Sequence, residues 1–193
     1  MTTLPEHFHT LSQLFRDMDT AWDEVAARYK FQCTGCKDNC CLSLFFHHTH
    51  VEADFLRYGF STLSAENQKK IKADARAYLE TTFPDGADTG HPPESKKMPC
   101  PLLTDGKCGL YRFRPMICRM HGLPHELHRP GFEPVKGPGC DAGKFDTQAY
   151  IPFDRTPFYQ RMAAVEMDYR TRTGAGGKIK QTVAQILLDT PDT

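Results

Sequence analysis

Apolar side chains recur at alternating steps of four and three residues through the start of the chain. The stripe consists of Leu4, Phe8, Leu11, Phe15, Met18, Trp22, Val25 and Tyr29. This spacing places them on one face of a helix, and polar residues such as Arg16, Asp19 and Glu24 fill the other faces. The pattern predicts an amphipathic helix over about residues 4–30, packed on the body of the protein through its apolar stripe.

Four more helices are expected from the later periodicity and from residues that begin or end helices. Gly59 is expected to end the first of them, and Ser64 to cap the start of the second. Pro157 suits the first turn of the third, which Gly174 then breaks. The expected ranges are about 50–58, 64–80, 157–171 and 180–189.

The middle of the chain is poorer in helical pattern. Residues 81–99 are rich in proline, glycine and charge, which is typical of a loop. Asp105-Gly106 is a turn dipeptide and predicts a short hairpin over about residues 100–111. The predicted fold is therefore mostly α: one small domain spanning residues 1–193, with an irregular cysteine-rich metal centre within 33–140, at most a short β-hairpin, and C-terminal helices over about 157–189.

Charge and hydropathy exclude several classes of partner. Lys+Arg and Asp+Glu both total 24, so the formal net charge is zero and provides no field to attract nucleic acid or an anionic membrane. The apolar run from Cys41 to Phe46 is too short to span a bilayer, and the N-terminus carries Glu6 and His7 where a signal peptide would be apolar. We expect no nucleic-acid or membrane partner and a cytoplasmic location.

The chemistry of the chain is concentrated in its cysteines. The eight are Cys33, Cys36, Cys40, Cys41, Cys100, Cys108, Cys118 and Cys140. Cytoplasmic thiols stay reduced, so metal ligation is expected here and disulfides are not. Cys33 and Cys36 form a C-x-x-C turn, which lets two thiolates bind one metal. Cys40 and Cys41 are adjacent and their side chains diverge, which suits a polynuclear cluster or two separate metals better than one ion.

Arginines and histidines near these cysteines have more than one interpretation. Arg114 and Arg119 flank Cys118, where they would neutralise an anionic cluster; they also fit a substrate anion, or an ion pair within the loop. His121 follows Cys118 by three residues and is the histidine best placed as an extra ligand, a proton carrier or a support for a ligand. The remaining histidines near the first cysteine group, less favoured as ligands, are His47, His48 and His50.

The cysteine spacing also resembles that of a known family. The series runs Cys33-x-x-Cys36-x-x-x-Cys40-Cys41, Cys100-Pro-Leu, Cys108-Gly-Leu-Tyr and Arg114-Pro-Met-Ile-Cys118-Arg119. Over about residues 33–140 it is similar to the bacterial CxxCxxCC family of zinc- or iron-chelating proteins, with three residues between Cys36 and Cys40 where the name-giving pattern has two. The resemblance implies a bound metal. Relatives include a flagellin lysine methylase with an iron–sulfur cluster, so a methyltransferase-type activity follows by analogy only.

Three functions fit these residues. The first is an iron–sulfur protein, with [4Fe–4S] as the favoured cluster, which is an enzyme if the cluster binds a substrate. The second is a zinc protein with two structural four-cysteine sites, and the third handles iron or zinc reversibly or senses redox state. Ligand chemistry favours the first. In each, metal ions are the partner, the small-molecule or protein substrate is unidentified, and folding is expected to depend on the metal.

Overall fold

The structure, a computed structural model, describes residues 4–33, 40–84 and 98–191. It confirms the mostly α class: six α-helices and several short 3₁₀ turns are described, and the described strands are two or three residues long. The chain divides into two compact units. Unit 1 comprises Met1–Asp38 with Met116–Gly176, and unit 2 comprises Asn39–Pro115 with Gly177–Thr193.

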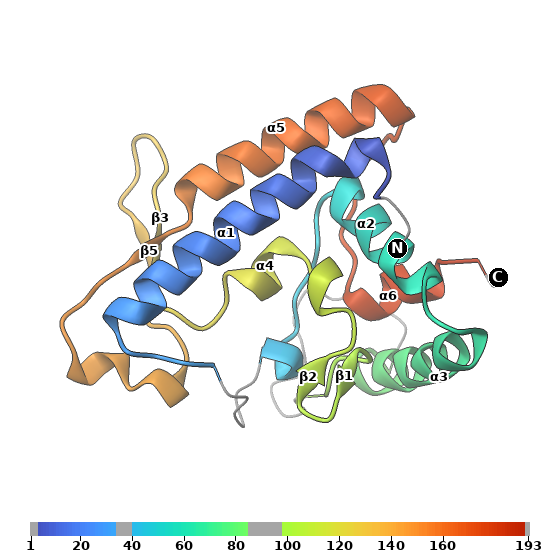
Figure 1. The fold of residues 1–193 in the computed structure, drawn as a ribbon, viewed down its shortest axis with the longest axis horizontal. Helices are drawn as coiled ribbons and strands as arrows, with labels where there is room; N and C mark the ends of the chain where they lie inside the picture. The colour runs from blue at the N-terminus through green and yellow to red at the C-terminus, as the bar shows by residue number, and fades with distance from the viewer. Residues whose placement is uncertain (1–3, 34–39, 85–97, 192–193) are drawn as a thin grey trace. The chain divides into compact units, whose positions relative to one another are not determined.

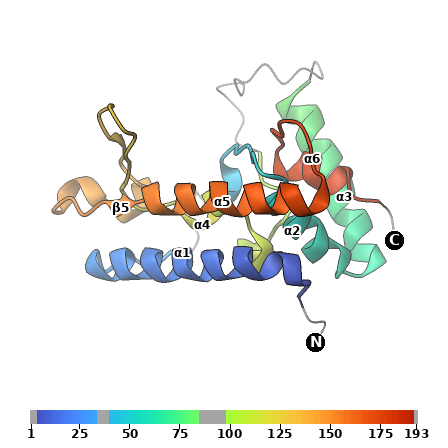
Figure 2. The same cartoon turned by 90° about the horizontal axis from the view of Figure 1, so that it is seen from above.

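Two long helices form the body of unit 1. Helix α1 (His9–Arg28), preceded by a 3₁₀ turn over Glu6–Phe8, lies antiparallel to α5 (Thr156–Thr173), and the two run side by side in Figures 1 and 2. The predicted apolar stripe is the buried face of α1: Leu11, Phe15 and Met18 are buried, and Leu14 joins them. Arg161 of α5 forms an ion pair with Asp17 across the helix pair.

Helix α5 begins and ends close to the residues that the sequence predicts. Pro157 lies in its first turn, and Gly174 ends it in the left-handed conformation, with a φ of 73°. A glycine adopts this conformation without the steric cost that a β-carbon imposes, so the predicted helix stop is confirmed.

Unit 1 also contains a three-stranded sheet that the sequence did not predict. Strand β3 (His125–Leu127) pairs antiparallel with β4 (Val135–Gly137) and parallel with β5 (Phe153–Asp154), in the order β4-β3-β5. The expectation of at most one hairpin was therefore wrong. Strands this short show no alternating hydrophobic pattern, and the β3–β5 pair joins segments far apart in the chain.

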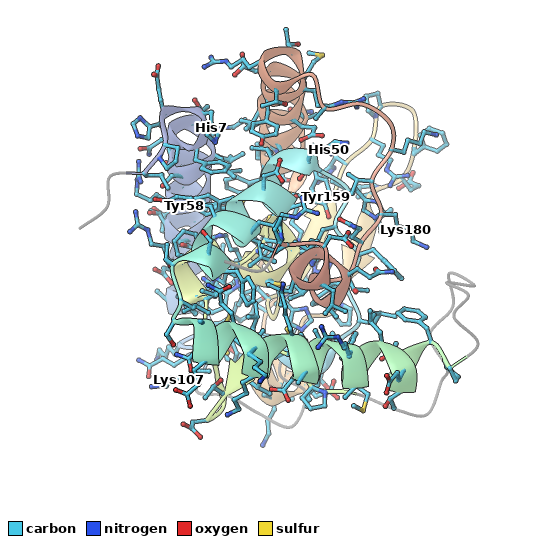
Figure 3. The ribbon with its side chains drawn as sticks, turned by 90° about the vertical axis from the view of Figure 1, so that its right-hand side faces the viewer. His7, His50, Tyr58, Lys107, Tyr159 and Lys180 are labelled. Atoms are coloured by element: carbon cyan, nitrogen blue, oxygen red, sulfur yellow. The ribbon has the colours of Figure 1, made fainter. Side chains whose placement is uncertain are left out.

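Three helices form the body of unit 2. They are α2 (His50–Ser61), α3 (Ala65–Thr82) and α6 (Val183–Leu188), and α6 packs against both of the others. The core includes Leu56 and Phe60 of α2 with Ile186 and Leu187 of α6. Ser64 accepts a hydrogen bond from the Asn67 amide and caps α3 as predicted. Figure 3 labels His50 in the first turn of α2 and Tyr58 farther along it.

Helix α2 does not end at Gly59, which corrects the predicted boundary. The helix continues to Ser61, and the ring of Phe113 packs directly on Gly59: a β-carbon added there would lie 2.3 Å from Phe113 Cγ. The glycine provides space for a neighbouring ring, and a helix stop is not its role. That distinction depends on a contact between residues 54 positions apart, which local sequence does not reveal.

The predicted hairpin is present in unit 2. Strand β1 (Leu103–Thr104) pairs antiparallel with β2 (Lys107–Cys108). Asp105 and Gly106 both have positive φ, of 50° and 76°, as a two-residue hairpin turn of the favoured twist requires.

Candidate metal centre

Unit 2 brings three cysteines into one backbone network. The Cys100 amide donates to the Cys41 carbonyl at 2.6 Å, and the Leu103 amide donates back to the Cys100 carbonyl at 2.8 Å. Leu103 is in turn the register partner of Cys108 across the β1–β2 hairpin. This long-range hydrogen bond therefore places Cys41 next to Cys100 within the unit, and the hairpin that carries Cys108 follows directly after Cys100.

The surroundings of these cysteines are largely apolar. Cys100 and Cys108 are half-buried against the cluster that includes Leu56, Leu102 and Leu110. Burial, with the nearby Cys100 as the second cause, raises the pKa of the Tyr78 hydroxyl to about 12. A neutral tyrosine and an apolar wall limit the access of water to the thiols, and a lower local dielectric would strengthen any interaction of their thiolates with a metal.

In unit 1, two further cysteines lie close to one chain segment. Cys118 is on the short helix α4 (Met116–Arg119), and the Cys140 amide donates to the Gly122 carbonyl at 2.9 Å. Gly139 makes this approach possible, because its φ is 84° and a β-carbon there would lie 2.9 Å from the Gly122 oxygen. The Trp22 indole donates to the His121 carbonyl at 3.0 Å and fixes the same segment to α1.

The ligand set itself remains a prediction. The structure gives Cys33, Cys41, Cys100, Cys108, Cys118 and Cys140 as thiols, with Cys33 exposed and the others half-buried. Cys36 and the side chain of Cys40 lie outside the described residues. Among the side chains that are described, no three of His, Cys, Asp or Glu are grouped as a metal site. The donor set fits zinc or iron chemically, because soft thiolates are the ligands these metals select.

The two arginines that flank Cys118 have other contacts. Arg119 is buried, forms an ion pair with Asp19 of α1 at 2.6 Å, and stacks on the Phe15 ring with its guanidinium 4.1 Å from the centroid. Arg114 stacks on Tyr111 at 3.8 Å. The ion pair of Arg119 thus joins α4 to α1, whereas the sequence had suggested a carboxylate within its own loop.

Arg155 is a buried, charged residue of unit 1 that the sequence pattern does not mark as functional. It lies at the start of α5, is buried, and donates from Nη2 to the Met120 carbonyl. Nothing in the local pattern distinguishes it from the exposed Arg161 or Arg170 of the same helix. Its burial is visible only in three dimensions.

His121 is half-buried beside this arginine. Burial, then Arg155 and His125, lowers the pKa of its imidazole to about 4. The ring is therefore neutral at physiological pH, which is the form that binds a metal or accepts a proton. The neutral ring suits metal ligation or support of a ligand, whereas a pKa of about 4 makes His121 a poor proton carrier near neutral pH.

His47 is the most buried histidine near the first cysteine group. It is 3% exposed, its backbone pairs in both directions with Gln181, and its Nε2 has no hydrogen-bond partner among the described residues. Burial, with a smaller effect of His48, lowers the pKa of its imidazole from 6.5 to about 4. Since an unfolded chain binds a proton near pH 6.5 and the folded one only near pH 4, acid favours unfolding.

We expect stability from His47 to be complete above pH 6.5 and lost as the pH falls toward 4, by up to about 3 kcal/mol. Urea unfolding of the metal-loaded protein at pH 7 and pH 5 measures the loss. His47→Gln should flatten the pH dependence, whereas His48→Gln, a change at an exposed neighbour, should retain most of it because His48 is only the smaller cause of the shift. An equal pH dependence in His47→Gln would contradict this assignment.

Within the part of the chain that the structure describes, no helix has the length and apolarity needed to cross a membrane. The fold is that of a mostly α, cysteine-rich protein. The family model CxxCxxCC, described as a putative zinc- or iron-chelating domain, matches residues 32–132, and the chain belongs to this family. The matched range includes every candidate cysteine ligand except Cys140. No curated protein and no solved structure matches the chain.

Proposed function

We propose that this protein binds an iron–sulfur cluster, of the [4Fe–4S] type, through its cysteine thiolates in the reducing cytoplasm. The observation that carries the proposal is the backbone arrangement around the cysteines of unit 2. There, the Cys40-Cys41 pair is joined to Cys100 through the hydrogen bond to the Cys41 carbonyl, beside a hairpin that carries Cys108. Adjacent cysteines serve several metal atoms with less strain than one tetrahedral ion.

The apolar surroundings of Cys100 and Cys108 support the same proposal, because burial and limited solvent access are among the factors by which a protein tunes a cluster. When bound, the cluster would supply electron transfer or an open coordination position for a substrate. The chain's own part is to hold the thiolates, exclude water through the Leu102 and Leu110 wall, and keep the Tyr78 hydroxyl neutral beside Cys100.

A second candidate, two structural zinc sites, is favoured by one specific observation. The stretches of chain that make up the two units contain four cysteines each. Unit 1 contains Cys33, Cys36, Cys118 and Cys140, and unit 2 contains Cys40, Cys41, Cys100 and Cys108. Four thiolates are the full shell of one structural zinc ion.

Metal analysis separates the two candidates. Protein from iron-replete cells, purified without oxygen, should be brown, contain iron and acid-labile sulfide in similar amounts, about four of each per cluster, and give a paramagnetic signal on reduction. Iron, sulfide and zinc are measured on the same sample, together with the absorption spectrum. Colourless protein with two equivalents of zinc would decide for the structural-zinc candidate, and metal-free folded protein would contradict both.

A further inference from the structure

The β3–β4 hairpin of unit 1 projects from the helix pair and carries an exposed aromatic residue. Figures 1 and 2 both show the hairpin extending away from α1 and α5. Phe132 lies in its turn and is 76% exposed, the largest fraction among the large apolar residues that the structure describes, and Val135 on β4 is 53% exposed. Large apolar side chains in water are unfavourable, and aromatic ones are enriched in protein interfaces.

The turn that presents Phe132 is preorganised. The Phe132 amide donates to the Arg129 carbonyl at 3.1 Å, and Gly131 has a φ of 80°. With Pro130 at the second position, these are the features of a type II β-turn, in which proline fixes one backbone dihedral and glycine accepts the positive φ. The ring is therefore held in place before a partner binds, so little conformational entropy is lost on association.

A polar cluster on one face of the hairpin fixes the two strands to each other. The Glu126 carboxylate of β3 lies 3.3 Å from Lys136 Nζ of β4 and 3.1 Å from His128 Nε2. The His128 amide also donates to Thr156 Oγ1 at 2.8 Å, and this bond joins the hairpin to the first turn of α5. The charges of this face are therefore engaged within unit 1.

The opposite face of the hairpin carries a cation and an anion side by side. Leu127 pairs with Val135 in the β3–β4 register, and side chains alternate between the two faces along a strand. Extending this register by two residues toward the turn places Arg129 opposite Glu133, on the same face as Val135. Both are exposed, and among the described residues neither side chain has a hydrogen bond or an ion pair. The hairpin tip, defined as Arg129, Phe132, Glu133 and Val135, thus combines apolar surface with one charge of each sign.

We propose that the hairpin tip is a self-association surface, at which two copies of this chain meet around a twofold axis. One cation and one anion give the tip no net charge that would select an acidic or a basic partner, but they make it complementary to itself. When two tips face each other across an axis along the strands, Arg129 of each copy lies opposite Glu133 of the other, with the Phe132 side chains between them. This inference does not depend on a bound metal.

The exposed apolar area sets the strength of the association. Phe132 and Val135 together expose on the order of 200 Å² in each copy, well below the about 800 Å² per partner of a stable complex. Edge-to-edge strand pairing adds little, because β4 is three residues long, follows Pro134 and exposes Lys136, all of which protect an edge strand. We therefore expect a weak dimer, with a Kd on the order of 100 µM.

The test is sedimentation velocity of the metal-loaded protein from about 10 to 500 µM, a range that brackets this Kd. A reductant is kept present, because Cys33 is exposed and could link two chains. The wild type should shift from one chain toward two across this range. Phe132→Ser should weaken the association at least about tenfold and leave the melting temperature unchanged, since the ring it removes is exposed. Met167→Ser, a change at a similarly exposed apolar residue of α5, should associate like the wild type.

Charge reversal tests the self-complementary pairing directly. Arg129→Glu makes the tip acidic and Glu133→Arg makes it basic, so each variant alone should remain monomeric, whereas an equimolar mixture of the two should associate at least as well as the wild type. Wild-type protein that stays monomeric at the highest concentration would overturn the proposal. So would equal association of Phe132→Ser and Met167→Ser, or a mixture of the charge variants that associates no better than either variant alone.

Discussion

Cys100→Ser is expected to reduce the metal content of the purified protein to less than about a tenth of the wild-type value for a single cluster, and to about half for two zinc sites. Serine is close to cysteine in size, so packing against Leu102 and Leu110 should change little. Its hydroxyl, however, is protonated at neutral pH and is a hard ligand, whereas zinc and iron–sulfur clusters require a soft thiolate. Loss of one half-buried ligand should therefore release the whole metal centre proposed for unit 2.

The measurement is iron, sulfide and zinc per chain, with the melting temperature of the same sample. We expect the melting temperature to fall sharply, since a metal held by loop residues contributes its binding free energy to folding. Ser64→Ala is the matched control: it removes the N-cap of α3, at a cost of about 1 kcal/mol, and should retain full metal. Cys100→Ser protein with wild-type metal content would remove Cys100 from the ligand set.

Met18→Asp is expected to destabilise the protein by at least about 4 kcal/mol. Met18 is 0% exposed on the buried face of α1. Its loss leaves a cavity that costs about 2–5 kcal/mol, and the aspartate would add a buried carboxylate. A typical domain has only about 5–15 kcal/mol in total, so much of the variant should be unfolded or insoluble.

Urea unfolding compares this variant with Arg16→Asp and Met18→Leu. Arg16 is exposed two residues away, and its hydrogen bonds reach only Ser12 and Gln13 of the same helix. We expect Arg16→Asp to cost about 0.5 kcal/mol or less, and Met18→Leu less than about 1.5 kcal/mol because it conserves volume. Equal losses for the two aspartate variants would mean that the wrong face of α1 has been assigned to the core.

The buried face of α1 could be predicted because helical periodicity is a local property of the sequence. The same holds for the Ser64 cap, for Pro157 in the first turn of α5 and for Gly174 at its end. Each depends on residues within one or two turns, and the physical rule is steric or involves one hydrogen bond. The Asp105-Gly106 turn was predictable for the same reason.

Features that depend on distant residues could not be predicted in this way. Gly59 has the sequence appearance of a helix end, but Phe113 packs against it and the helix continues. The β4-β3-β5 sheet pairs segments too short to show alternation. Whether a glycine stops a helix or receives a ring is decided by packing free energy, which depends on the whole fold.

At the candidate site, the sequence by itself determined the kind of chemistry: eight cysteines, their spacing and hence membership of a zinc- or iron-chelating family. The tertiary structure decided which of the nearby arginines are buried and which partners they contact. It pairs Arg119 with Asp19, and it buries Arg155, whose guanidinium donates to the Met120 carbonyl between Cys118 and Gly122. A ligand type is a property of one side chain, whereas burial and charge compensation depend on which distant residues the fold brings together.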